Sequence, residues 1–128
     1  MSTMPQIAPE FRPGRNRSGS TIGKYLCVKR DASNLPNGLT LTAADTDVAV
    51  GVTGEEIANN ANGNVCIKGR HPVTANGAIT AGLRIACEAN GKVKAAASGD
   101  TVIGVAEEAA LADNDVILAE LNFPGVFW

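Results

Sequence analysis

The feature that most constrains the fold of this chain is an internal repeat. Residues 37–52 (NGLTLTAADTDVAVGV) align without a gap with residues 90–105 (NGKVKAAASGDTVIGV). Each copy has an Asn-Gly pair, a stretch of small residues, an aspartate and a Val/Ile-Gly-Val step. Strand-like segments on both sides extend the repeat halves to roughly 24–69 and 82–121. A sheet unit this short cannot bury its apolar face alone. Two copies packed face to face, or joined into a barrel, therefore predict one β domain with one core.

Short apolar runs separated by Asn-Gly, Gly-Asp and Asp-rich breaks predict eight strands. They cover residues 24–29, 38–42, 48–53, 65–68, 83–88, 92–96, 101–106 and 116–121. Residues 107–112 are the one segment expected to form a helical turn. The fold class is therefore all-β, a small β-barrel or β-tulip-like domain built from two repeat-related sheet units.

The glycine of the Val/Ile-Gly-Val step, Gly51 or Gly104, occupies the same place in both copies. A glycine inside a strand usually marks a bulge or a close approach of two backbones. We expect each one to mark a bend that lets its unit wrap. After a slip of one residue, the acidic pair Glu55-Glu56 matches Glu107-Glu108.

The N-terminal residues differ from the rest in composition and charge. Residues 1–20 contain three prolines and no hydrophobic period, which predicts an extended basic arm ahead of a single domain at 21–128. Residues 1–30 carry six basic side chains and one acidic, whereas residues 31–128 carry five basic and twelve acidic. Arg12, Arg15 and Arg17 of the arm are candidates for contact with an acidic partner surface, and a solvated leader is the alternative.

No arrangement of residues in the sequence points to catalysis, a cofactor or a metal. His71 is the only histidine, and the three cysteines, Cys27, Cys66 and Cys87, lie far apart in apolar contexts typical of buried strand residues. Residues 14–21 (GRNRSGST) lack the lysine and the preceding strand of a phosphate loop. The paired glutamates are expected to lie on solvent-facing turns.

The sequence also argues against nucleic acid, membrane and export. The acidic body lacks a basic face with interleaved aromatics for direct nucleic acid binding. No run approaches the roughly 20 apolar residues of a membrane span, and the N-terminus lacks the apolar core of a secretion signal.

Residues 38–121, and above all ITAGLRIACEANGKVKAAASGDTVIGVAEEAALADNDVILAEL, resemble the head decoration proteins of tailed bacteriophages, also called capsid cement proteins. The likeness is a rhythm: a small residue and Gly before a strand, an Asn-Gly turn, an Ala-rich strand, a Gly-Val step, an acidic loop and a closing strand. The resemblance implies a structural virion protein with no catalytic residues or cofactor. It implies a homotrimer, made in the bacterial host cytoplasm, that decorates the outer surface of the capsid by bridging subunits of the major capsid protein.

Three of the five aromatic residues of the chain, Phe123, Phe127 and Trp128, fall in its last six positions. Large apolar side chains dominate the energetics of protein interfaces. We therefore expect this aromatic tail to dock on the capsid or on a neighbouring copy. In the alternative, the tail folds back and plugs the open end of its own barrel.

Two other functions remain open at this stage. One is a small ligand- or carbohydrate-binding β module, which would need a polar groove with an aromatic platform. The other is a tail or baseplate structural protein of a phage, since a similar β unit would serve there as well.

Overall fold

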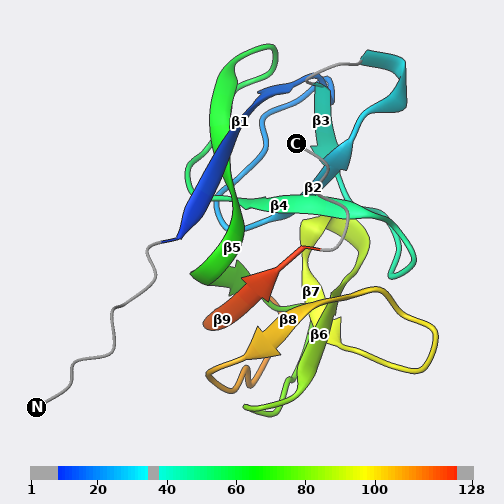
Figure 1. The fold of residues 1–128 in the computed structure, drawn as a ribbon, viewed down its shortest axis with the longest axis vertical. Helices are drawn as coiled ribbons and strands as arrows, with labels where there is room; N and C mark the ends of the chain where they lie inside the picture. Colours follow the sequence, from blue (N-terminus) through cyan, green and yellow to red (C-terminus); the bar gives the residue numbers. More distant parts are fainter. Residues whose placement is uncertain (1–8, 35–37, 124–128) are drawn as a thin grey trace, which may run out of the picture.

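The computed structural model describes residues 9–34 and 38–123, and in this part of the chain the regular structure is almost entirely β (Figure 1). The all-β prediction is confirmed. Two short 3-10 turns, η1 (Ala32–Asn34) and η2 (Ala89–Gly91), accompany the strands. The strands are β1 (Glu10–Asn16), β2 (Cys27–Arg30), β3 (Gly38–Leu41), β4 (Ala49–Thr53), β5 (Asn62–Thr74), β6 (Arg84–Cys87), β7 (Val93–Ala95), β8 (Val102–Ala106) and β9 (Val116–Asn122).

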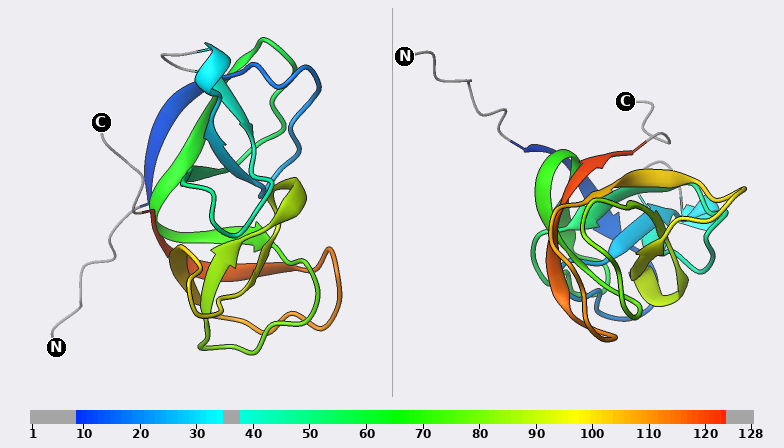
Figure 2. Two further views of the ribbon diagram at one scale, coloured as in Figure 1. Left: turned by 90° about the vertical axis from the view of Figure 1, so that its right-hand side faces the viewer. Right: turned by 90° about the horizontal axis from the view of Figure 1, so that it is seen from below.

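The strands form two rings that share β5. Neighbouring strands follow the order β1-β3-β2-β4-β5-β9-β8-β6-β7, and β1 also pairs with β5. The first ring (β1, β3, β2, β4 and the first part of β5) is thus a closed five-stranded barrel. In the second ring (the rest of β5, then β9, β8, β6 and β7), Ala75 returns to Val93 of β7 through one parallel bridge. The two rings stack along the long axis, and β5 runs through both (Figures 1 and 2).

The two rings repeat the same hydrogen bonds, so the repeat is longer than its sequence signature. Each copy has five strands, and β1 of the first ring corresponds to the second part of β5. The bond from Asn16 N–H to Ala61 O in the first ring corresponds to the bond from Ala75 N–H to Asp115 O in the second. In the same way, Asn60 N–H to Asn16 O corresponds to Asn114 N–H to Ala75 O, and Tyr25 N–H to Thr53 O corresponds to Gly82 N–H to Ala106 O. The isolated bridge Ile22–Ile57 likewise recurs as Ile79–Ala110.

The predicted N-terminal arm is wrong for the part of it that forms β1. Glu10–Asn16 pairs antiparallel with β5 and parallel with β3, and Asn16 is fully buried. The folded body therefore begins about ten residues before the predicted boundary at residue 21. Residues 1–8 of the predicted arm lie outside the described residues.

Two smaller predictions around the acidic pairs are also wrong. Residues 107–112 form bends and an isolated bridge rather than a helical turn. The sequence alignment needed a slip of one residue to match the two acidic pairs. In the structure three residues separate Thr53 from the Ile57 bridge and three separate Ala106 from the Ala110 bridge, so the two copies align here without that slip. The structural counterpart of Glu55 is therefore Glu108, and that of Gly54 is Glu107.

The buried residues form two clusters rather than the single core that the sequence predicted. The smaller cluster fills the first ring and consists of Ile22, Val28, Leu39, Val50, Val65 and Ile67. The larger one fills the second ring and also contains the first-ring residues Cys27, Ala49, Val52 and Cys66. In β2, Cys27 belongs to the larger cluster and Val28 to the smaller one; in β4, Ala49 and Val52 belong to the larger cluster and Val50, on the other side of the bulge from Val52, to the smaller one, so both strands lie between the clusters. All five residues of β4 are buried for this reason.

The predicted role of the two strand glycines is confirmed. The β2–β4 pairing shifts register next to Gly51, and the β6–β8 pairing shifts next to Gly104. A β-carbon at Gly104 would overlap the backbone carbonyl oxygen of Glu120, and one at Gly51 would lie 2.7 Å from Val65 Cγ2. A side chain at Gly104 would therefore clash with the backbone of β9, and one at Gly51 would clash with the Val65 side chain of β5, so both bulges favour glycine.

The loop between β3 and β4 fastens the first ring to the second. Thr42 Oγ1 donates to the carbonyl of Glu88 (2.9 Å), and Thr101 N–H donates to the carbonyl of Asp45 (3.2 Å). Lys94 Nζ of β7 lies 2.6 Å from Asp45 Oδ2. The side-chain hydrogen bond to Asp45 raises the pKa of Lys94, so its ammonium stays charged at this junction.

Candidate partner-binding surface

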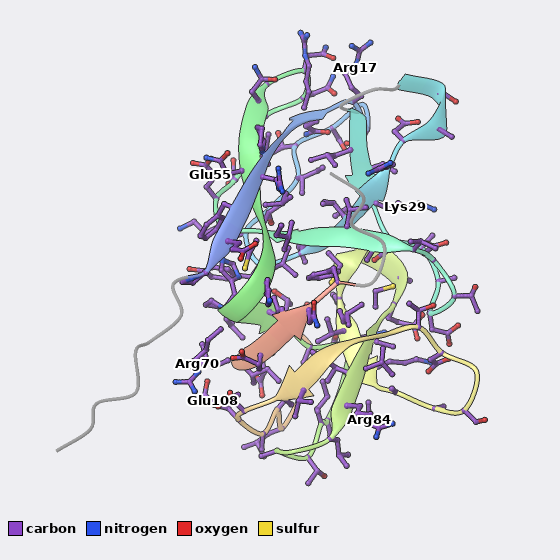
Figure 3. All side chains as sticks on the ribbon, in the orientation of Figure 1. Arg17, Lys29, Glu55, Arg70, Arg84 and Glu108 are labelled. Atoms are coloured by element: carbon purple, nitrogen blue, oxygen red, sulfur yellow. The ribbon has the colours of Figure 1, made fainter. Side chains whose placement is uncertain are left out.

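The three predicted arginines are exposed on or next to β1, which is part of the barrel wall. Arg12 and Arg15 belong to the strand itself, and Arg17 follows its end. Arg15 Nε donates to the carbonyl of Asn60 (2.8 Å), which fixes part of its side chain on the surface. Figure 3 shows Arg17 at the first-ring end of the molecule, opposite Arg84. The charge predicted for an extended arm thus lies on or next to a strand of the barrel wall.

Phe123, the first residue of the predicted aromatic tail, packs inside its own chain. It is 4% exposed and belongs to the larger core cluster. Its N–H donates to the carbonyl of Ile67 (3.3 Å), which continues the β9 ladder by one residue. Phe123 is therefore a core residue that extends β9, and not part of an exposed tail. Phe127 and Trp128 lie outside the described residues.

The two ends of the described chain flank β5 at the same level, one on each side of the strand. Lys68 pairs with Glu10 of β1 and also with Asn122 of β9. A β-carbon at Gly69 would lie 2.9 Å from Pro9 Cα, so the chain enters the fold in close contact with β5. Pro9 and Phe123, at the two ends of the described chain, therefore lie at the same level of β5.

An aromatic hollow, which sequence reasoning missed, lies on the first-ring side of this junction. It has a volume of about 330 Å³ and is lined by Phe11, Gly54, Glu55, Asn64 and His71. Phe11 is 47% exposed, whereas His71 is buried at the base of the hollow. The only sequence signal was the presence of a lone histidine among few aromatics, which does not indicate that β1 and β5 bring them together.

His71 is held between two aromatic rings. The Phe11 ring contacts it edge-on at a centroid distance of 5.8 Å, and the Tyr25 ring does so at 5.9 Å. Tyr25 has φ of 60°, in the left-handed region that bulky residues rarely adopt. Its counterpart in the second ring is Gly82, with φ of 88°. The first ring therefore places a strained tyrosine against His71 where the repeat has a glycine.

The hydrogen bond of His71 fixes its tautomer. Its Nδ1 lies 2.8 Å from the carbonyl oxygen of Pro72, and a carbonyl oxygen only accepts, so Nδ1 carries the proton. Nε2 is then an acceptor on the side of Gly54, where a β-carbon would lie 3.3 Å from it. Desolvation by burial lowers the pKa of His71, which favours this neutral ring.

The cysteines lie in the core, where their thiols are expected to be unreactive. Cys27, Cys66 and Cys87 are fully buried and free, as the sequence predicted. Burial raises the pKa of Cys87 to about 11, and it also raises the pKa of Cys27 and Cys66. The nucleophilic thiolate is therefore disfavoured at neutral pH.

Residues 9–34 and 38–123 contain no group of three or more His, Cys, Asp or Glu side chains that could hold a metal ion. Within the same residues, no helix has the length and apolar character that crossing a membrane requires.

Exposed apolar side chains are unevenly distributed over the two rings. Of the seven large ones among the described residues, five belong to the second half of the chain: Leu83, Val102, Val105, Leu111 and Val116. Leu111 is 85% exposed, in the loop between β8 and β9. Alternation of apolar residues predicted these strands but did not show that several of their valines face outward.

The fold and its surface define a class of protein: a small double-ring β module with outward-facing arginines and valines. A family model described as phage cement protein matches residues 21–121, and the chain belongs to that family. It is a structural protein of the phage virion, and the family resemblance seen in the sequence is confirmed.

The fold has a solved counterpart. The crystal structure of the N base of head fiber gp8.5 in bacteriophage phi29 superposes with a TM-score of 0.72. The alignment covers 94% of this chain and 100% of that chain at 15% sequence identity, so it shows a shared fold. A search of curated proteins finds no match.

Proposed function

We propose that this protein decorates the outer surface of the phage capsid and cements it by bridging subunits of the major capsid protein. The observation that carries the proposal is the match of nearly the whole β domain to the phage cement family. The molecule has a purely structural role in this proposal, and the host cytoplasm is where it is made before it joins the virion. A head location, rather than a tail or baseplate, is supported by the similar fold of a head fiber base.

The surface suits such a role. Arg12 and Arg15 project from β1, which pairs with β5 and at its end also with β3, and Arg17 follows directly, so the backbone that carries them is ordered before binding. Ordered charges on a rigid strand give electrostatic steering without the entropy cost of fixing a flexible arm. Exposed valines of the second ring, Val102, Val105 and Val116, offer apolar area for the same contact.

The direct test is co-sedimentation of the purified protein with heads that lack it. Saturable binding at a fixed number of copies per head supports the proposal, and an absence of binding contradicts it. The matched variant replaces Arg12, Arg15 and Arg17 with glutamine. We expect weaker binding and a shallower loss of affinity between low and high salt, because screening acts on exposed charges. Equal salt dependence in the two proteins would remove the arginines from the interface.

We further propose that the protein acts as a homotrimer, with Phe127 and Trp128 docking on a neighbouring copy or on the capsid. Sedimentation equilibrium is expected to give three times the chain mass of 13.1 kDa. A chain that ends after Phe123 keeps the core residue and loses the two remaining aromatics. It is expected to fold normally and to assemble or bind heads less well. Unchanged assembly and unchanged binding would exclude the tail from both contacts.

A further inference from the structure

The aromatic hollow lies where the second ring carries an ion pair. Pro13 of β1 and Pro72 of β5 occupy equivalent rungs of the two ladders. Phe11, two residues before Pro13, is therefore the counterpart of Arg70. As shown above, Gly54 corresponds to Glu107 and Glu55 to Glu108. Figure 3 shows Glu55, Arg70 and Glu108 along the same edge of the molecule, Glu55 in the first ring and the others in the second.

In the second ring, the charged groups at this place are satisfied within the chain. Arg70 Nη2 lies 3.4 Å from Glu107 Oε1, and Glu108 Oε1 accepts a hydrogen bond from Leu118 N–H at 2.7 Å. No cation from outside the chain is needed to pair these two carboxylates.

In the first ring, the position that corresponds to Arg70 does not carry a positive charge. Phe11 replaces the arginine, and Gly54 replaces its glutamate. Glu55 is exposed and has no hydrogen-bond or ion-pair partner among the described residues. The space left by the smaller residue at 54 is part of the hollow of about 330 Å³. The first ring thus presents a carboxylate and a cavity where the second ring presents a completed pair.

The groups around the hollow are acceptors and π surfaces. Glu55 contributes a carboxylate, His71 contributes the unprotonated Nε2, Asn64 contributes a side-chain amide, whose oxygen can accept, and Phe11 contributes an exposed ring. A guanidinium is planar, always charged and carries five N–H donors, and it stacks on aromatic faces. This set of groups matches it better than an apolar side chain, which would leave the polar groups unpaired, or a carboxylate, which Glu55 would repel.

We propose that the aromatic hollow binds the guanidinium of an arginine side chain from a protein partner, in the space beside Phe11 that Gly54 leaves open. The charge of Glu55 and the stacking surface of Phe11 select the ligand, and His71 and Asn64 orient it. The identity of the partner rests on the proposed function, which makes it a major capsid protein subunit. The chemistry of the hollow itself does not.

The first test uses small probes and the isolated protein. N-acetyl-arginine amide and its neutral isostere N-acetyl-citrulline amide are titrated separately into the ¹⁵N-labelled protein, and amide chemical shifts are followed. For a single side chain we expect a dissociation constant on the order of millimolar. The shifts should centre on Gly54, Glu55, Asn64 and His71, and citrulline should bind at least about tenfold more weakly. Equal binding of both probes, or shifts centred elsewhere, would overturn the proposal.

Variants then separate the hollow from the rest of the surface. Glu55→Gln should abolish arginine binding, whereas Glu56→Gln removes the same charge from the next residue and should leave it unchanged. Phe11→Arg supplies the chain's own guanidinium, as in the second ring, and should fold normally but no longer bind the probe. Arginine binding that survives in Glu55→Gln would overturn the proposal.

The same pair of variants distinguishes this inference from the proposed function. If wild-type protein binds heads, Glu55→Gln should bind them more weakly than Glu56→Gln. Equal binding by the two variants overturns the arginine site while leaving the cement function in place. Specific arginine binding by a protein that binds no heads supports the site and contradicts the function.

Discussion

Replacing Phe123 with alanine tests whether the last aromatic of β9 belongs to the core or to an interface. Phe123 is 4% exposed within the larger core cluster. A buried phenylalanine hides about 150–250 Å², which is worth about 4–6 kcal/mol at ~25 cal/mol per Å² as an upper bound. Truncations of this kind in cores cost about 3–5 kcal/mol. Phe123 follows the end of β9, where the chain can detach locally, so we expect a loss near the lower figure, about 3 kcal/mol.

The assay is urea unfolding followed by far-ultraviolet circular dichroism. With a slope of about 1–3 kcal/mol per molar for a protein of this size, the midpoint should fall by about 1–3 M. Phe11→Ala is the matched control, because it removes the same ring from a position that is 47% exposed. It should cost about 1 kcal/mol or less. Equal losses in the two variants, or a loss below about 1 kcal/mol for Phe123→Ala, would refute the placement of Phe123 in the core.

Two further outcomes are expected for the isolated protein. Gly104→Ala should lower the free energy of unfolding by about 1–3 kcal/mol, because the new β-carbon meets backbone that cannot move aside. The control Gly23→Ala meets only Leu26 Cδ1 at 3.5 Å and should change the free energy of unfolding by less than about 0.5 kcal/mol. Similar thermal melting of the two variants would contradict the bulge geometry. Burial lowers the pKa of His71 below its usual 6.5, so its contribution to stability is complete above that pH and is lost as the pH falls from there through the folded pKa. The slope of stability between pH 7 and 5 should therefore be shallower in His71→Gln, and an unchanged slope would show that the ring is not desolvated.

The repeat and the strands could be predicted from the sequence because both depend on local signals. Short apolar runs and Asn-Gly breaks located seven of the nine strands to within a few residues, and for β5 they gave only residues 65–68 of Asn62–Thr74. The glycine in Val/Ile-Gly-Val identified both bulges, because only a residue without a β-carbon tolerates the contacts at Gly51 and Gly104.

The two strand segments that the sequence did not predict, β1 and the second part of β5, each contain a proline. Arg17 N–H donates to Leu39 of β3, and alternation puts the Pro13 nitrogen on the same side, before the two-residue pairing with β3 begins. Thr74 N–H donates to Tyr25, on the side of β5 away from β9, and alternation puts the Pro72 nitrogen there too. Neither proline removes a ladder hydrogen bond, so both are tolerated. Sequence rules penalise proline without knowing which side of a strand is paired.

The candidate site was the least predictable part. Arg12, Arg15 and Arg17 were predicted on an arm and are exposed on or next to β1 instead. Phe123 was predicted in an exposed tail and is buried in the core, because the ladder between β5 and β9 extends to it. The aromatic hollow arises from β1, β5 and the residues after β4, which are far apart in the sequence. Its comparison with the second ring became possible only when the strand registers were known.

The measurement that tests the central claim most directly is the thermal release of DNA from heads that lack this protein, followed with a DNA-binding dye before and after the protein is added back. A cement that bridges capsid subunits should raise the release temperature, and saturation of this effect should coincide with saturation of binding. Protein that saturates the heads and leaves the release temperature unchanged would decorate the capsid without cementing it, and would contradict the account.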